Sequence, residues 1–549
     1  MELISILLFS AVSIFVVRRV QIRLRLSAAK HPSISGHARI SKRLARLVPY
    51  YEYPLEDAFA TDGAPLEFVE RRRRDFERLV AARRADSACS REFSQQLAQQ
   101  VSDVQFTNAY RVPFQYRQLA GSLAEPSVAI SSDGVLLENL DGQKTYDLGG
   151  SYGVNLFGYD FYKACIAEGS EMVKSLGPVL GPYHPVVADN AARLCEISGM
   201  DEVSFHMSGT EAVMQAVGLA RYHTRRRNIV MFCGAYHGWW DGVQPGVGGQ
   251  RQTRDVFMLK ENSADTLKVL ATRNDIACVL INPLQALHLN RGASSDAMLL
   301  NSDRAAAFDR SAYSQWLHDL REVYTRRGIV MIMDEVFLGF RLGVGGAQAF
   351  FGVRADLVTY GKTLGGGMPV GVLCGKARFM KRYRDDAPTD ICFARGTFNS
   401  HPYVMASMNV FLRHVCSPEI KAQLTHDHVL WDERAAQLNT RFAEADLPLK
   451  VHNLSSVWVL TYTRPGRYNW MLQFYLRDQG LMLSWVGTAR FIFSHNYTDA
   501  DFAEVMHRII AGALRMREAG WWEAPASLTN QSIKKQVFRE MLIKRLGRG

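Results

Sequence analysis

Residues 355–375 read ADLVTYGKTLGGGMPVGVLCG, and the fold of the chain can be worked out from this stretch. The apolar run that ends at Gly361 is typical of a short buried strand, and Lys362 follows it shortly before three consecutive glycines. An earlier stretch, IVMIMDEVFLGF, starts at Ile329 with a second buried-strand pattern that ends in Asp334. A lysine and an aspartate are therefore expected at the ends of two apolar strands.

This pair of side chains suits pyridoxal phosphate. The lysine amine forms an imine with the aldehyde of that cofactor, and a buried carboxylate faces the ring nitrogen and keeps it protonated. A lone lysine beside glycines is usually a solvated surface residue. The inference therefore depends on Lys362 and Asp334 together.

The chain between its two ends indicates an α/β fold. Amphipathic helices alternate with apolar runs such as NIVMFCG, IACVLINP and IVMIMDEV from about residue 185 to 390, which predicts a mainly parallel sheet with helices on both faces. The predicted organisation is an anchor helix over 1–25, a polar helical linker over 26–110, the first part of a smaller α+β domain over 111–184, a large cofactor-binding domain over 185–390, the second part of the smaller domain over 391–515 and a basic tail over 516–549. The arginine run at 71–74 is expected to lie on a solvated helix face.

The formal charge of +11 is concentrated at the ends of the chain. Residues 1–50 contain nine lysines and arginines against one glutamate, and residues 531–549 contain six against one. The body is therefore close to neutral, which argues against nucleic acid as a partner. The eight cysteines are widely spaced and form no C-x-x-C pair, so we expect reduced thiols and neither a zinc site nor a disulfide framework.

The N-terminus has the composition of a membrane segment. The uncharged run LISILLFSAVSIFVV, from Leu3 to Val17, is followed by four arginines. At helical rise it spans about 22 Å, against about 30 Å for a hydrocarbon core. We predict a membrane anchor with the catalytic body in the cytoplasm; an interfacial helix or a buried core helix are the alternatives. The tail from residue 533 has an apolar helical face ringed by basic residues, typical either of a helix on an anionic membrane or of one packed on the protein itself.

Three more motifs carry candidate binding residues. SGTEAVMQAVGLAR, from Ser208, places two hydroxyls and free backbone amides at a helix start, a pattern that can hold phosphate but is more often an ordinary cap. AYHGWWDG places Tyr236 and His237 directly after an apolar run, where an aromatic ring can stack on a flat cofactor. GTFNSHP offers the hydroxyl of Thr397 beside a glycine.

Taken together and in this order, SGTEA, YHG, DEV, GKTLGGGMPVG and GTFN resemble the class III aminotransferase family over about residues 111–515. Within the family, the chain looks similar to glutamate-1-semialdehyde aminomutases and closer still to the aminotransferase domains of polyketide and peptide synthases, the latter through GVNLFG, GGAQAFFGVRADLVTYGK and SHNYTDADF. The resemblance implies a fold type I pyridoxal-phosphate transferase with a seven-stranded type of sheet.

The resemblance also implies roles for individual residues. Lys362 would be the Schiff-base lysine and proton carrier, and Asp334 the partner of the ring nitrogen. The remaining cofactor contacts would be Tyr236 stacked on the ring, Val336 on its other face, Ser208, Gly209 and Thr210 on the phosphate, and Thr397 on the phosphate of a neighbouring subunit's cofactor. His237 would accompany the stacking tyrosine and orient it. A homodimer is therefore implied.

The substrate is less determined by the sequence. Met207 and Asn282 stand where the family often has asparagine and glutamate, while Arg395 and Arg490 are candidates for a substrate carboxylate. The apolar N-terminus suggests amination of a keto or aldehyde group on a long-chain acyl, polyketide-like or lipid-like acceptor, possibly carrier-bound. The alternatives are an aminomutase or soluble-substrate aminotransferase, and a membrane-tethered scaffold without activity.

Overall fold

The computed structural model describes residues 2–31, 37–110, 112–124, 128–244, 249, 251, 254–287, 306–484 and 487–547. The predicted domain boundary at residue 111 falls outside them, and of residues 2–8 only the helical backbone is described.

The centre of the fold is the seven-stranded mixed sheet that the sequence predicted. The strands lie in the order β4-β10-β9-β8-β7-β5-β6, and β10 alone runs against its neighbours. Their bounds are β4 Glu202–His206, β5 Asn228–Phe232, β6 Val256–Leu259, β7 Ile276–Ile281, β8 Val330–Asp334, β9 Leu357–Gly361 and β10 Gly371–Gly375. Because six of the seven strands point the same way, their carboxyl ends share one edge.

Both faces of this sheet are covered. All six residues of β7 are buried, and alternate residues along the strands contact opposite layers, as the pleat requires. On one face Cys278 belongs to a buried cluster that includes residues of helix α9, and on the other Val279 belongs to a larger cluster that includes residues of helices α8, α10, α11 and α14. The bounds are α8 Val186–Ser198, α9 Gly209–Thr224, α10 Ala264–Thr272, α11 Arg310–Arg327 and α14 Pro402–Val415.

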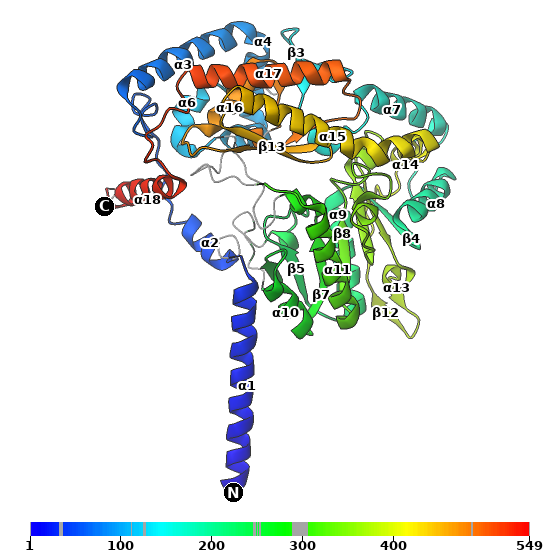
Figure 1. The fold of residues 1–549 in the computed structure, drawn as a ribbon. Helices are drawn as coiled ribbons and strands as arrows, with labels where there is room; N and C mark the ends of the chain where they lie inside the picture. Colours follow the sequence, from blue (N-terminus) through cyan, green and yellow to red (C-terminus); the bar gives the residue numbers. More distant parts are fainter. Residues whose placement is uncertain are drawn as a thin grey trace.

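The smaller domain is built from both ends of the chain (Figure 1). Its strands are β1 Ser131–Asp133, β2 Leu136–Glu138, β3 Lys144–Asp147, β13 Leu449–Leu454, β14 Val457–Tyr462, β15 Leu481–Met482 and β16 Phe491–Ile492. Its helices include α3 Leu66–Asp86, α4 Ala88–Gln100, α5 Ser102–Tyr110, α6 Arg117–Gly121, α15 Pro418–Glu444, α16 Leu472–Asp478 and α17 Asp499–Glu518, while α7 Tyr159–Val173 packs on α14. Strand β15 pairs in parallel with β3, so residues more than 300 positions apart form one sheet.

Residues 51–121 belong to this smaller domain rather than to a linker. Phe59 and Phe76 join the same core as Trp521. Arg72, which the sequence placed on a solvated face, is fully buried. It forms an ion pair of 2.9 Å with Asp62 and donates to the carbonyls of residues 59, 520 and 523. These acceptors compensate the loss of hydration, which a charge run in the sequence does not reveal.

The two termini lie outside the main body. Helix α1, Glu2–Ala29, extends away from the rest of the chain, whereas α2, Ala38–Ala45, and α18, Asn530–Leu546, lie near its base (Figure 1). Only the last turn of α1 is built into the body, where Lys260 donates its backbone N–H to the carbonyl of Ala29. A helix thus forms over the predicted anchor, but among the residues searched, those that the structure describes, no helix is long and apolar enough to cross a membrane.

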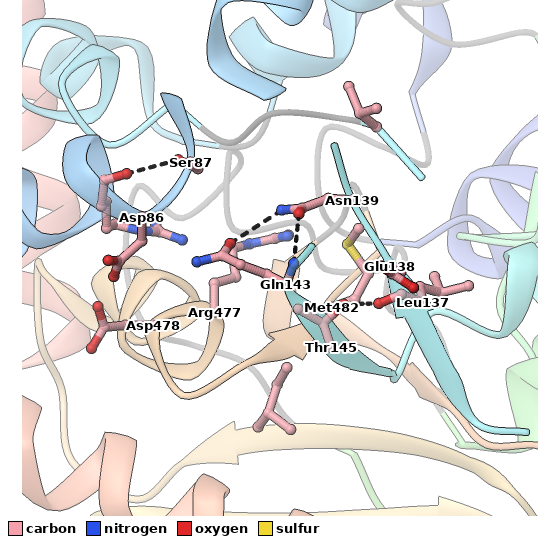
Figure 2. A pocket seen from close by; sticks show the side chains of 13 residues that line it. Asp86, Ser87, Leu137, Glu138, Asn139, Gln143, Thr145, Arg477, Asp478 and Met482 are labelled. Atoms are coloured by element: carbon pink, nitrogen blue, oxygen red, sulfur yellow. Dashed lines mark hydrogen bonds between the residues drawn. The ribbon is translucent and has the colours of Figure 1, made fainter. Parts of the chain in front are cut away.

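A small pocket of about 100 Å³ lies in the smaller domain (Figure 2). The end of α3, strands β2 and β3 and the end of α16 line it, with Arg83 and Arg477 beside Asp86, Glu138 and Asp478. Burial and the nearby Arg477 lower the pKa of Arg83 to about 9. The pocket shares no residue with the predicted cofactor site, and its charges are of both signs.

Candidate active site

The carboxyl edge of the large sheet gathers most of the predicted site. Ser208 follows β4, Tyr236 follows β5, Asn282 follows β7, Asp334 ends β8 and Lys362 follows β9. These residues are far apart in the sequence, and parallel strand order alone brings them to one place. Such an edge is the usual position of ligands in open α/β sheets.

Asp334 is buried and held by three donors. The Nδ1 atom of His237 lies 2.7 Å from Oδ2. The Thr359 hydroxyl and the backbone N–H of Val336 donate to Oδ1 at 3.1 and 3.2 Å. With a carboxylate as acceptor, the proton of the imidazole is assigned to Nδ1. This arrangement fixes the orientation of the carboxylate.

Lys362 is placed on a strained backbone in a mostly desolvated position. Its φ of +51° lies in the left-handed region, which non-glycine residues adopt at an energetic cost. Burial lowers the pKa of its amine, whereas the charge of Asp334 opposes that shift and Arg341 and Arg490 add to it. A lower pKa increases the neutral fraction of the amine, the form that acts as nucleophile and base.

A capped helix begins at the predicted phosphate cradle. Ser208 caps α9 and accepts from the N–H of Glu211 at 3.3 Å, and the carbonyl of Ser208 accepts from Ala212. Within the described residues no hydrogen bond takes up the amides of Gly209 and Thr210. A Cβ on Gly209 would lie 2.7 Å from Cγ1 of Val336, so only glycine lets the helix start approach this closely.

Tyr236 and His237, neighbours in the loop after β5, have different environments and different contacts. Tyr236 has 64% of its side chain exposed, and its carbonyl accepts from Asn282 Nδ2 at 2.9 Å. His237 is buried and contacts Asp334 rather than orienting the tyrosine. Asn282 also caps the following turn through the N–H of Leu284. The residue that departs from the family pattern thus holds the aromatic loop in place.

The two arginines proposed for a carboxylate have different environments. The guanidinium of Arg490 lies 5.4 Å from the ring centre of Phe337, and the amine of Lys362 lies 5.7 Å from the same ring. Burial lowers the pKa of Arg490 to about 10, and its Nε has no hydrogen-bond partner among the described residues. Arg395 lies in an exposed segment instead.

Thr397 is exposed, in the same segment as Arg395. No hydrogen bond among the described residues ties it to the cradle at Ser208. Its assignment to a neighbouring subunit's cofactor therefore stays a prediction.

Three residues of the site were not singled out from the sequence. Thr359 donates to Asp334, and the ring of Phe337 lies beside the amine of Lys362. Glu335 accepts from the N–H groups of Ala347 and Gln348. Burial raises the pKa of Glu335 to about 7. All three lie within three residues of Asp334 or Lys362 along the chain, a proximity that could have drawn attention to them.

Residues 122–512 match the class-III aminotransferase family. The chain belongs to this family. Glutamate-1-semialdehyde 2,1-aminomutase from Acetivibrio thermocellus is 31% identical over 305 residues, which are 52% of this chain and 66% of that protein. The chain thus spans slightly less than two thirds of that relative. The enzyme of the same name from Flavobacterium johnsoniae is 31% identical over 359 residues, 62% of this chain and 75% of the relative.

Solved structures show the same fold. A glutamate-1-semialdehyde-aminomutase from Pseudomonas aeruginosa PAO1 gives a TM-score of 0.65 at 17% identity, covering 83% of this chain and 100% of that chain. The resemblance of this class-III aminotransferase to fold type I transferases is therefore confirmed, and its cofactor is pyridoxal 5′-phosphate.

The residues present fit this cofactor. Lys362 offers a desolvated amine, Asp334 a fixed buried carboxylate, and the start of α9 two amides without a protein acceptor among the described residues. When bound, pyridoxal phosphate supplies an electron sink that stabilises negative charge on the substrate carbon. Asp334 would face its ring nitrogen, Tyr236 and Val336 its two faces, and Ser208, Gly209 and Thr210 its phosphate.

Proposed function

We propose that this enzyme moves an amino group within or between small substrates that carry a carboxylate, as an aminomutase or an amino-acid aminotransferase. The observation that carries the proposal is the pair of cations next to the ring of Phe337: Lys362, which does the chemistry, and Arg490, which can hold the substrate. A guanidinium binds a carboxylate through two parallel hydrogen bonds.

Each residue of the site has a separate role in the proposed reaction. The Lys362 amine, neutral more often because it is desolvated, takes a proton from the substrate carbon and returns it at a second carbon. Asp334 keeps the positive charge at the ring nitrogen paired while His237, Thr359 and Val336 hold its carboxylate still. Preorganised charges of this kind need no reorientation during the reaction.

The test uses glutamate 1-semialdehyde as single substrate and, in parallel, a panel of amino donors with keto-acid acceptors. Conversion of the semialdehyde without a second substrate indicates an aminomutase, and activity only with a pair indicates an aminotransferase. We expect Arg490→Gln to lower kcat/KM about 10- to 150-fold, corresponding to about 1.5–3 kcal/mol for a charged hydrogen bond. Arg395→Gln, an exposed arginine, is the matched control. Equal kinetics for both variants would refute the role of Arg490.

A second candidate is amination of a long-chain, lipid-like or polyketide-like acyl acceptor, either free or held by a carrier. The observation that favours it is helix α1, whose exposed apolar side chains would bring the enzyme to such acceptors. Full-length enzyme assayed with vesicles should then prefer long over short β-keto substrates. Equal kcat/KM for both chain lengths would rule this candidate out.

A homodimer forms part of the proposal, because the family resemblance assigns the exposed Thr397 to the phosphate of a neighbouring subunit's cofactor. Mixed dimers of Lys362→Ala and Thr397→Val subunits test this. If Thr397 reaches across the interface, such a dimer combines one site that lacks both the lysine and the partner's hydroxyl with one site that keeps both. If Thr397 serves the partner's cofactor, the Thr397→Val subunit in the mixed dimer faces an intact threonine and regains wild-type cofactor affinity. Unchanged affinity in the pure Thr397→Val dimer would contradict this role.

A further inference from the structure

Helix α18 has two apolar sides, and only one of them is used by the fold. Ile533 and Val537 are buried against the smaller domain. Phe538, Leu542 and Leu546, spaced four residues apart, form a second stripe with 63%, 44% and 78% of their side chains exposed. Residues at this spacing lie one above the other on a helix, so this outer stripe is continuous.

The inner side of α18 is firmly attached, which fixes where the outer stripe points. Glu540 forms an ion pair of 2.9 Å with Arg467, whose side chain is 3% exposed. It also accepts from the Tyr51 hydroxyl at 3.0 Å, and Gln536 donates to the carbonyl of Thr61. The sequence alone left two alternatives, packing on the protein or on a membrane. In the structure the inner side packs on the protein, and the outer stripe remains exposed.

The C-terminal end of α18 contacts the segment that follows α2. Arg545 of α18 donates to the carbonyl of Leu47, just after α2, and Figure 1 shows α2 between α18 and the body end of α1. Along α2 and the residues that follow it, Ile40, Leu44 and Val48 are exposed. Exposed basic residues surround these apolar side chains: Arg39, Arg43 and Arg46 at α2, and Lys535, Arg539 and Lys544 on α18.

Helix α1 is apolar around its whole circumference over residues 14–17. Ile14, Phe15, Val16 and Val17 are consecutive and each more than half exposed, and four consecutive positions cover every side of a helix. A helix of this kind is stable in contact with lipid or another protein rather than with water. Arg18, Arg19, Arg23 and Arg25 follow at the end nearer the body, where anionic headgroups would meet them.

We propose that the outer stripe of α18 and the basic residues of α2 dock this enzyme on an anionic lipid bilayer, into which the apolar part of α1 inserts. We infer an anionic lipid surface because the apolar residues of all three helices are bordered by lysine and arginine, whose positive charge complements anionic headgroups. Each basic residue near an anionic surface strengthens binding roughly fivefold, and that gain falls with salt.

The test is flotation of the full-length, cofactor-loaded enzyme with vesicles of phosphatidylcholine alone or mixed with phosphatidylglycerol. We expect binding to the mixed vesicles that weakens with salt, and much less binding to phosphatidylcholine. The triple variant Phe538→Gln, Leu542→Gln, Leu546→Gln should lower the bound fraction at least about tenfold, as should Val12→Asp with Val16→Asp. Activity on a soluble substrate should stay unchanged, because none of these residues belongs to the site.

The matched control is Leu66→Gln with Val429→Gln and Leu430→Gln, which removes equally exposed apolar residues from α3 and α15. It should bind vesicles like the unmodified enzyme. Three results would overturn the proposal: undiminished binding of the α18 variant, equal binding to both vesicle types, or no vesicle binding combined with a higher oligomer that the α18 substitutions dissolve. The last result would identify a second copy of the chain as the occupant.

Discussion

Replacement of His237 by phenylalanine removes the shortest hydrogen bond to Asp334 and keeps a flat aromatic side chain at this position. The bond is 2.7 Å long, whereas the two that remain, from Thr359 and Val336, are 3.1 and 3.2 Å. A hydrogen bond to a charged group contributes about 1.5–3 kcal/mol. At about 1.4 kcal/mol per factor of ten, we expect kcat/KM to fall about 10- to 150-fold. The Kd of the cofactor should rise, because the carboxylate that faces its ring is held less firmly.

The assay measures steady-state kinetics together with cofactor affinity, followed by the visible absorbance of the bound cofactor. His237→Asn is the rescue variant, because its side-chain amide places a donor close to the position of Nδ1. His495→Phe is the matched control, since His495 Nδ1 also lies 2.7 Å from a carboxylate, that of Asp427, but in the smaller domain. If His237→Phe changed folding stability as much as His495→Phe but neither kinetics nor cofactor affinity, the positioning role of His237 would be refuted.

Three further expectations follow. Lys362→Ala should abolish turnover and the visible band of the lysine-bound cofactor while thermal unfolding stays cooperative; residual turnover would mean that another amine does the chemistry. Gly209→Ala should raise the Kd of the cofactor at least tenfold, a loss of about 1.4 kcal/mol, because the new methyl group lies 2.7 Å from Val336, and an unchanged Kd would contradict the close approach. Burial raises the pKa of Glu261 to about 8, so its contribution to stability is full below the unfolded value of 4.5 and is lost as pH rises through about 8. The free energy of unfolding of Glu261→Gln should therefore rise on the order of a few kcal/mol relative to that of the wild type between about pH 5 and pH 9. The measurement is the unfolding midpoint of both proteins across this pH range. A difference between the midpoints that does not change with pH would argue against a buried carboxyl that titrates.

Much of the fold was readable in the sequence because it depends on local patterns. The strand runs ending at Asp334 and Gly361 are continuous and apolar, and they occur where the sheet has β8 and β9. The helix after Ser208 begins at the predicted residue. By contrast, the helices between residues 66 and 110 look polar. Their place in the smaller domain was missed because the buried charge of Arg72 is compensated largely by acceptors distant in sequence, at residues 520 and 523.

The candidate site shows the same division. Each predicted residue was found from a short motif, but which atoms meet depends on strand order. His237 was expected to orient Tyr236 because they are neighbours in sequence, yet its ring bonds to Asp334, almost a hundred residues away. Likewise, the sequence gives no reason to prefer Arg490 over Arg395 as the carboxylate-binding residue. In the structure Arg490 and Lys362 both lie near the ring of Phe337, which places Arg490 at the site.

The sequence by itself determined the chemical groups of this protein: the lysine, the carboxylate, the phosphate-binding helix start, and the apolar and basic ends. Those follow from residue type and spacing, which act over a few positions of chain. Only the tertiary structure decided the partners of those groups, because burial, pKa and hydrogen bonding depend on neighbours that are distant in sequence. The desolvation of Lys362, the attachment of His237 to Asp334 and the exposed outer stripe of α18 are all consequences of packing between remote segments.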